Sequence, residues 1–286
     1  MNLSRREFVQ MGGTLAAAAL TASCQSRFAH DLACQLYTLR SLLPDSAEAT
    51  LRTLSEIGYR EVEAYGSDVD SQLPLFRDFS LRPVSIHFSN SLLTDEGVLE
   101  EEIDRARQAG FEYGVIPSLP SQLRGDLDAF KHFAEKANRF GELCKTAGIM
   151  LCYHNHAFEF QPMEGTSPLE VMMDHFEVGL VGLELDAFWS SVAGVDPVGI
   201  LNRYEGRVPL IHLKDKAEGT KQTYDGNDVR IDQFKEVGNG VMDIPGILRA
   251  AQSRGVRHYI VEQDHCAGDP LESVRASFDY LTHVSI

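Results

Sequence analysis

The sequence lacks several features that define other classes of protein. It has five cysteines in 286 residues, and none stands in a CxxC pair, so neither a disulfide framework nor a thiolate zinc site is indicated. After the N-terminus no apolar run reaches the roughly twenty residues that a membrane span needs. Basic runs are also missing, and 42 acidic against 26 basic residues give a formal net charge of −16. Because this charge repels a phosphate backbone, we expect no binding to nucleic acid.

The positions of the cysteines are typical of residues that pack in a hydrophobic core. Cys34 and Cys152 lie in apolar, strand-like runs. Free cysteine in such a run behaves as a small hydrophobic side chain. We therefore expect buried thiols.

The first residues resemble a twin-arginine export signal. Ser4 to Gln10 reads SRREFVQ, in which two arginines precede a polar residue and Phe8, and the apolar run GGTLAAAALTA follows. The resemblance predicts a signal peptide at residues 1–23 and an exported, periplasmic protein. Cys24 stands where a bacterial lipobox places its lipidated cysteine. A lipid anchor at Cys24, cleavage to a free periplasmic protein and an ordinary amphipathic helix are the alternatives, and only the first attaches the chain to a membrane.

One short pattern recurs along the rest of the chain. A helical stretch ends, a glycine follows and a strand begins, as in LSEIGYREVEAY, ARQAGFEYGVI, CKTAGIMLCYHN and AQSRGVRHYIVEQ. Glycine past a helix supplies the left-handed residue that closes it. Together with hydrophobic periodicity, the pattern predicts strands near 32–37, 59–64, 83–87, 113–116, 149–154, 181–186, 208–213 and 258–262. It predicts helices near 46–57, 71–79, 95–109, 127–147, 168–175, 197–204, 243–253 and 270–283.

Eight strands that each precede a helix predict an α/β fold: a single (β/α)8 TIM barrel over residues 24–286. A doubly wound sheet usually has fewer strands, and the glycine-rich phosphate loop of a dinucleotide-binding fold is missing after the first strand. The longest non-helical connection covers about 215–242 and follows the seventh strand. We expect that loop on the catalytic rim.

Polar residues that a packed core would not tolerate stand at the predicted strand ends. In a barrel the C-terminal strand ends meet at one rim, and alternation places residues i and i+2 on the same face. The same-face pairs are His154 with His156, Glu184 with Asp186, His212 with Lys214, and Glu262 with Asp264, while Glu63 and His87 end the second and third strands.

Carboxylates and imidazoles without thiolates suit one divalent ion, which could be Mn²⁺, Mg²⁺, Co²⁺, Fe²⁺ or Zn²⁺. Asp186, His212 and Glu262 on successive strands are the strongest candidates for its ligands. Taken singly, other strand-end residues have ordinary explanations. His87 fits a hydrogen-bonded structural role, Glu63 a helix cap, and Lys214 a bridge to a neighbouring carboxylate.

Four stretches, GLELDAFWSSVAGVDP, PLIHLKDK, EVGNGVMD and IVEQD, resemble the sugar phosphate isomerase/epimerase family of xylose-isomerase-like barrels. In that family Glu, Asp, His and Glu from four strands hold one divalent metal. The last three correspond to Asp186, His212 and Glu262. The first usually stands in an ENH triplet, which here begins with His154 and reads HNH. The resemblance implies a metal site of His154, Asp186, His212 and Glu262.

The altered triplet bears on catalysis. Epimerases of the family use their first and last glutamates as bases on opposite faces of the sugar. With His154 in the first place a carboxylate is missing on that side, and Glu159 and Glu184 are the nearest replacements. The resemblance thus implies Glu262, Glu159 and Lys214 as catalytic residues. Substrate contacts are expected from Glu63, His87, His156, Glu184 and Trp189, with sugar stacking or core packing as the alternatives for Phe188.

The function that the resemblance implies is a metal-dependent isomerase or epimerase. Its substrate would be a small carbohydrate, a free or glycosidic keto-sugar, reacting through an enediolate. Two alternatives stay open: a 3-keto-glycoside lyase or hydratase on the same fold, and a carbohydrate-binding lipoprotein without catalysis. The sequence gives no indication of an oligomeric state.

Overall fold

A computed structural model describes residues 27–66, 69–93 and 95–286. The predicted signal peptide at 1–23 and the predicted lipidation site Cys24 lie outside these ranges. Over the described ranges, no helix combines the length and hydrophobicity that a membrane crossing requires.

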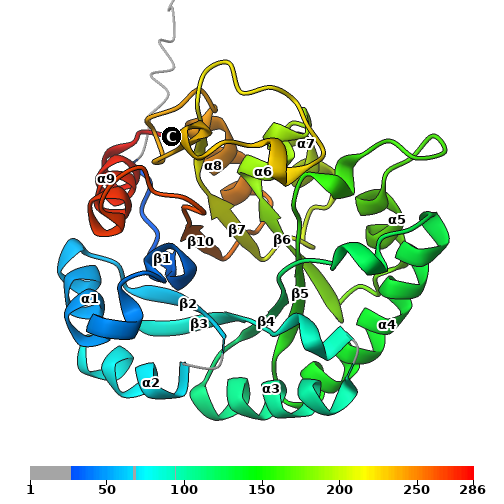
Figure 1. The fold of residues 1–286 in the computed structure, drawn as a ribbon, viewed down its shortest axis with the longest axis horizontal. Helices are drawn as coiled ribbons and strands as arrows, with labels where there is room; N and C mark the ends of the chain where they lie inside the picture. The colour runs from blue at the N-terminus through cyan, green and yellow to red at the C-terminus, as the bar shows by residue number, and fades with distance from the viewer. Residues whose placement is uncertain (1–26, 67–68, 94) are drawn as a thin grey trace, which may run out of the picture.

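The centre of the molecule is a closed barrel of parallel strands surrounded by helices (Figure 1). This confirms the predicted TIM barrel. Around the barrel the strands follow the order β1, β10, β7, β6, β5, β4, β3, β2. Their bounds are β1 Leu32–Gln35, β2 Glu61–Tyr65, β3 Arg82–His87, β4 Tyr113–Ile116, β5 Met150–His154, β6 Val181–Asp186, β7 Leu210–Leu213 and β10 His258–Val261.

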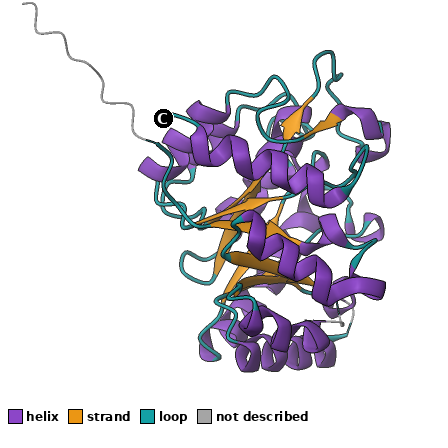
Figure 2. Cartoon of the chain, turned by 90° about the vertical axis from the view of Figure 1, so that its left-hand side faces the viewer, coloured by secondary structure: helices purple, strands orange, loops and turns teal. Residues whose placement is uncertain are grey.

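Helices cover the outside of the strands, as the view turned by 90° shows (Figure 2). All eight predicted helices are present with shifts of a few residues at their ends. The structure adds α6, a helix of six residues that is too short to produce a periodic pattern. The helices are α1 Leu43–Ile57, α2 Val69–Asp78, α3 Glu96–Ala109, α4 Leu127–Thr146, α5 Pro168–His175, α6 Ala187–Val192, α7 Pro197–Arg203, α8 Ile244–Ser253 and α9 Pro270–His283.

Local sequence sets the helix ends. The recurring glycines after helices adopt positive φ, for example 84° at Gly110 and 80° at Gly148, as the sequence pattern predicted. At the other end, the Asp126 carboxylate accepts a hydrogen bond from Ala129 N and caps α4. Ser167 and Glu170 form a capping box at α5. These contacts satisfy backbone groups that each helix end would otherwise leave unpaired.

The barrel interior has an apolar layer that supports a polar one. Ala33, Val115, Cys152, Leu210 and Ile260 pack together inside the barrel and are buried. Because side chains alternate along a strand, the next inward positions on these strands lie nearer the C-terminal rim. Those positions carry Gln35 on β1 and His154 on β5, and Glu262 lies just past the end of β10. The fold therefore gathers polar side chains at one end.

Cysteines in the described part of the chain form no disulfide. Cys34, Cys144 and Cys152 are buried and Cys266 is half-buried. The expectation of buried thiols is confirmed for Cys34 and Cys152.

The long connection after β7 is anchored to a buried carboxylate. It begins with β8 (Asp215–Lys216), which pairs with β9 (Phe234–Lys235) in a two-stranded antiparallel sheet. Asp215 Oδ2 accepts hydrogen bonds from Gly238 N and Gly240 N at 3.1 Å, and Oδ1 accepts one from Met242 N at 3.0 Å. A Cβ at position 240 would lie 2.3 Å from Asp215 Oδ1. Glycine there allows the chain to fold back onto the aspartate.

We predict that Gly141→Ala destabilises the barrel. A Cβ at position 141 in α4 would lie 2.8 Å from the carbonyl oxygen of Leu180, just before β6. Overpacking against backbone costs about 1–3 kcal/mol, and thermal unfolding should show a lower Tm. Gly199→Ala in α7 is the matched control, because its nearest contact would be 3.9 Å away. That helix should be unchanged or slightly stabilised. Equal Tm values for the two variants would contradict tight α4–β6 packing.

Candidate active site and metal centre

Strand pairing brings the predicted site residues together. In the register of β5 with β6, His154 lies opposite Glu184. In the register of β6 with β7, Asp186 lies opposite His212. Asn155 joins the ends of β5 and β6, since its side chain accepts a hydrogen bond from Asp186 N and donates one to Asp186 O. The middle residue of the HNH triplet thus fixes the position of Asp186.

The four expected metal ligands converge. His154, Asp186, His212 and Glu262 are buried, and each offers a ligand atom within 4.8 Å of the others. His154 Nε2 lies 3.6 Å from Asp186 Oδ2, and His212 Nδ1 lies 2.9 Å from Glu262 Oε2. The quartet could hold a divalent cation with imidazole and carboxylate ligands.

A buried carboxylate lies behind each of the two histidines. His154 Nδ1 donates to Glu184 Oε2 at 3.0 Å, and His212 Nε2 donates to Glu63 Oε1 at 2.7 Å. This leaves the other ring nitrogen of each histidine on the side of Asp186 and Glu262. A carboxylate that accepts from the distant nitrogen orients a metal-binding histidine and makes it more basic.

The charge balance of the cluster also fits a cation. Five carboxylates belong to the cluster against one lysine: Asp186, Glu262 and Asp264 contact Lys214, and Glu63 and Glu184 contact His212. Glu63 Oε2 and Glu184 Oε1 are buried without a hydrogen-bond partner in the described part of the chain. Buried carboxylates are stable only when paired with positive charge or protonated. A bound divalent ion would supply that charge.

The charge state of each ligand follows from burial and from its neighbours. Burial lowers the pKa of His154 well below its ordinary value, and nearby positive charges act in the same direction. Its ring is therefore neutral and able to bind a cation. Burial raises the pKa of Asp186 to about 6, although Lys214 opposes this. Burial acts against protonation of His212, but neighbouring carboxylates outweigh it and hold its pKa well above the ordinary value.

Lys214 belongs to the cluster, as expected. Its ammonium is fully buried and lies 2.8 Å from Asp186 Oδ2 and 2.6 Å from Asp264 Oδ2, and it also donates to Glu262 Oε2. Lys214 therefore bridges two candidate metal ligands. Asp264, two residues after Glu262 on the same face, is a site residue that was not assigned a role from the sequence, although alternation placed it there.

A cavity of about 690 Å³ opens above the cluster. His87, His154, His156, Glu262 and Asp264 line it together with residues of β2, β3 and α3. His87 also contacts the layer below, since its Nε2 donates to Glu184 Oε2 at 2.9 Å. The structure thus places His87 and His156 where substrate contact is expected.

Glu63 and Glu184 differ from the expectation of substrate contact. Both are fully buried beneath the ligands and neither lines the cavity. Gln35 Nε2 donates to Glu63 Oε1 at 2.7 Å and completes its surroundings. Alternation along a strand gives the face of a side chain but not its depth, so the sequence did not separate these two glutamates from the residues above them. Their contacts are those of groups that orient the histidines.

Glu159 also lies apart from the cluster. Its side chain is fully buried and accepts hydrogen bonds from Tyr153 Oη at 2.6 Å and from His156 N at 2.9 Å. Tyr153 packs against Phe133 on the outer side of β5. The chain after His156 turns outward, so this carboxylate faces the helices. The geometry does not support Glu159 as the replacement base.

Of the two roles considered from the sequence, sugar stacking and core packing, Phe188 has the position for core packing and Trp189 the position for sugar stacking. Phe188 is fully buried and stacks on Phe234 with ring centroids 4.6 Å apart. Trp189 lines a smaller cavity of about 290 Å³ beside the first.

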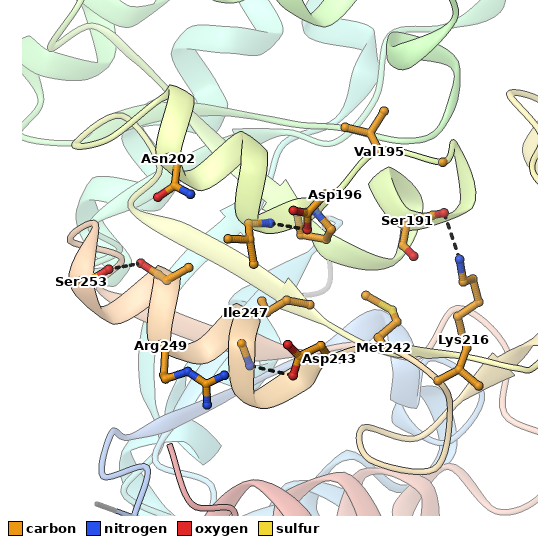
Figure 3. A pocket seen from close by; sticks show the side chains of 16 residues that line it. Ser191, Val195, Asp196, Asn202, Lys216, Met242, Asp243, Ile247, Arg249 and Ser253 are labelled. Carbon is orange, nitrogen blue, oxygen red and sulfur yellow. Dashed lines mark hydrogen bonds between the residues drawn. The ribbon is translucent and has the colours of Figure 1, made fainter. Parts of the chain in front are cut away.

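A larger groove, of about 970 Å³, lies on the outside of the barrel between α7 and α8 and contains none of the cluster residues (Figure 3). His154, His156, Glu262 and Asp264 line the rim cavities instead.

Residues 96–283 match the model of the xylose isomerase-like TIM barrel family. The chain belongs to this family. Inosose dehydratase from Clostridium perfringens is 30% identical over 163 residues, and the match covers 54% of each chain. The chain therefore spans about half the length of that relative. Inosose dehydratase from Clostridium beijerinckii is 26% identical over 265 residues, covering 82% of this chain and 88% of the relative.

A solved structure supports the same grouping. A sugar phosphate isomerase/epimerase from Parabacteroides distasonis superimposes with a TM-score of 0.76 at 25% identity. The superposition covers 94% of this chain and 97% of that one. The family resemblance seen in the sequence is thereby confirmed, while the names of the relatives divide between isomerase and dehydratase.

We predict that Glu184→Gln weakens metal binding about tenfold to a hundredfold, because His154 loses the charged acceptor of its Nδ1 proton. Competition with a chelating dye would measure the affinity of the purified protein for Mn²⁺, Co²⁺ and Zn²⁺. Glu61→Gln is the matched control, since Glu61 is a buried strand glutamate at the other end of the barrel, paired with Arg82 and His258. Equal affinities for both variants would remove Glu184 from the metal site.

We predict that Glu159→Gln leaves turnover unchanged but flattens the pH dependence of stability. Burial raises the pKa of Glu159 to about 7 from an ordinary value of 4.5. Between these two values the unfolded chain has released a proton that the folded chain keeps, so wild-type stability falls as the pH rises. Glutamine removes this contribution. Denaturant unfolding from pH 4.5 to pH 7 checks it, with the exposed Glu56→Gln as the control. Lost turnover would restore Glu159 as a base.

Proposed function

We propose that the protein is a metal-dependent enzyme that enolises a carbohydrate ketone and eliminates a β-leaving group, as a dehydratase or lyase does. One observation carries the proposal: among the strand-end residues that line the cavity, carboxylates stand on the β10 side only. Glu262 and Asp264 follow β10, whereas His154 and His156 stand on the β5 side, across the rim. Elimination needs one base, while epimerisation by proton transfer needs a base on each face of the substrate.

Each residue has a defined part in this reaction. A divalent cation held by His154, Asp186, His212 and Glu262 would polarise the substrate carbonyl. Glu262 takes the proton from the carbon next to the carbonyl. Although burial opposes it, Lys214 and His212 hold the pKa of Glu262 well below its ordinary value, so the carboxylate is ionised when substrate arrives.

Elimination balances with these groups alone. The C–H bond next to the carbonyl breaks and its proton passes to Glu262. The C–O bond at the β-carbon breaks, a C=C bond forms, and the proton leaves with the departing oxygen as water or an alcohol. Lys214, which is fully buried among Asp186, Glu262 and Asp264, holds the base in place and compensates its charge.

The charges of the residues that line the cavity favour an uncharged substrate. In the described part of the chain its lining includes the carboxylates of Glu101, Glu102, Glu262 and Asp264, and Arg105 is already paired with Glu102 and Asp70. A phosphate group would meet mainly negative charge. The proposed export, which would take the protein away from cytoplasmic sugar phosphates, agrees with a free or glycosidic keto-sugar, or with a keto-polyol such as the inosose in the names of the relatives.

Epimerisation is the second candidate. His156, which follows β5, lines the cavity, and a relative of known structure is named an isomerase/epimerase. A neutral imidazole there could remove the proton on its own face of the substrate, as Glu262 does on the other face. The two reactions share the enolisation step and differ in whether the β-substituent is lost.

We predict that metal-loaded protein in D₂O exchanges the proton next to the carbonyl of a keto-inositol or a 3-keto-glycoside and releases water or the aglycone. NMR would record both events. Removing the metal with a chelator, or Glu262→Gln, should lower the rate at least about a hundredfold, as loss of a general base does. Exchange with a new stereocentre and no release identifies an epimerase. Full turnover without metal refutes the mechanism, and sugar binding without exchange identifies a binding protein.

A further inference from the structure

The smaller rim cavity adjoins the cavity above the metal cluster. His156, Ser118 and Asp264 line both. The remaining wall of the smaller cavity comes from Phe158 and Trp189, which follow β5 and β6, and from the long connection after β7, including Gly226 and Phe234. A substrate bound at the cluster could therefore extend past His156 and Asp264 into a second compartment.

Aromatic rings enclose this compartment. The Trp189 ring lies 5.5 Å from His156 and 5.8 Å from Phe234 between centroids. The Arg124 guanidinium lies 3.4 Å from the centroid of the Phe158 ring, and its Nε donates to Leu119 O at 2.7 Å. Flat apolar faces beside polar groups suit the C–H face of a sugar ring better than an extended chain.

Two buried nitrogen atoms of the compartment lack partners. Trp189 Nε1 and His156 Nδ1 have no hydrogen bond in the part of the chain that the structure describes, and both residues line the cavity. An unsatisfied buried polar atom costs about 1–3 kcal/mol. A ligand with hydroxyl groups in this compartment would offer these two atoms hydrogen-bond partners.

We propose that this compartment is a subsite for a second, hydroxylated ring, so that the substrate is a two-ring glycoside rather than a single sugar. The proposal rests on the proposed function, because the first ring would be the one that reacts above the metal cluster. The second ring would stack on Trp189 and accept a hydrogen bond from its Nε1.

The sequence supplies a direct probe, because Trp189 is the one tryptophan of the chain. Its fluorescence can be followed during titration of the metal-loaded protein with cellobiose, maltose, trehalose and sucrose, and with methyl β-glucoside as the single-ring control. At least one disaccharide should change the emission saturably and bind about tenfold more tightly than the control, or about 1.4 kcal/mol. No response to any disaccharide, or equal affinity for the single ring, overturns the subsite.

A variant that fills the compartment tests its location. A Cβ at Gly226 would lie 3.4 Å from Trp189 Cη2, so Gly226→Leu should occupy the space beside the ring. Gly268→Leu is the control, since a Cβ there meets nothing within 4 Å. Calorimetry should show disaccharide binding weakened about tenfold in Gly226→Leu and unchanged in Gly268→Leu, with circular dichroism to confirm folding. Unchanged binding in Gly226→Leu overturns the proposal.

The outcome separates the two proposals. Disaccharide binding at Trp189 without metal-dependent proton exchange supports the subsite and refutes the enolisation mechanism. Proton exchange on a single-ring ketone, unaffected by Gly226→Leu and without any disaccharide effect on Trp189, refutes the subsite and leaves the mechanism intact.

Discussion

The active end of this barrel depends on two histidines that are each held by a buried carboxylate. His154 is bound to Glu184 and His212 to Glu63. Taking the charge of a carboxylate out of water is unfavourable unless it is paired. When each ring donates a hydrogen bond to its glutamate, its other nitrogen is left on the side of Asp186 and Glu262. The geometry of the candidate metal site is therefore set from below, by two glutamates that do not line the cavity.

The stretch YHNHAFEF at the end of β5 places side chains on both the inner and the outer face of the barrel wall. His154 and His156 face the inside, where one joins the ligand quartet and the other lines both cavities. Tyr153 and Glu159 face the helices and bond to each other. A histidine at the first ligand position also removes one negative charge from a site already rich in carboxylates. It leaves the β10 side as the source of carboxylate chemistry, which is the physical basis for preferring elimination.

The connection after β7 gives the site its second compartment. Asp215, the first residue of this connection, joins its two ends, because its carboxylate accepts hydrogen bonds from backbone N–H groups of the Gly238–Met242 turn. With the ends fixed, Gly226 and Phe234 lie against Trp189 and close the wall. Specificity for a larger substrate would thus come from a loop that is separate from the reacting groups, an arrangement that barrels allow because loops vary while strand ends stay in place.

The sequence alone determined the barrel and its eight αβ units, because period-2 alternation and glycine after helices are local signals. Polar strand ends singled out Asp186, His212 and Glu262, while the family resemblance proposed His154 as the first ligand. The depth and direction of side chains, and the contacts between residues far apart in the chain, were decided by tertiary structure. Alternation could not tell that Glu63 and Glu184 lie one layer deeper than the ligands, nor that the turn after His156 sends Glu159 outward. The contacts between Trp189, Phe158 and the 215–242 loop join segments far apart in the chain, and only the closed barrel brings them together.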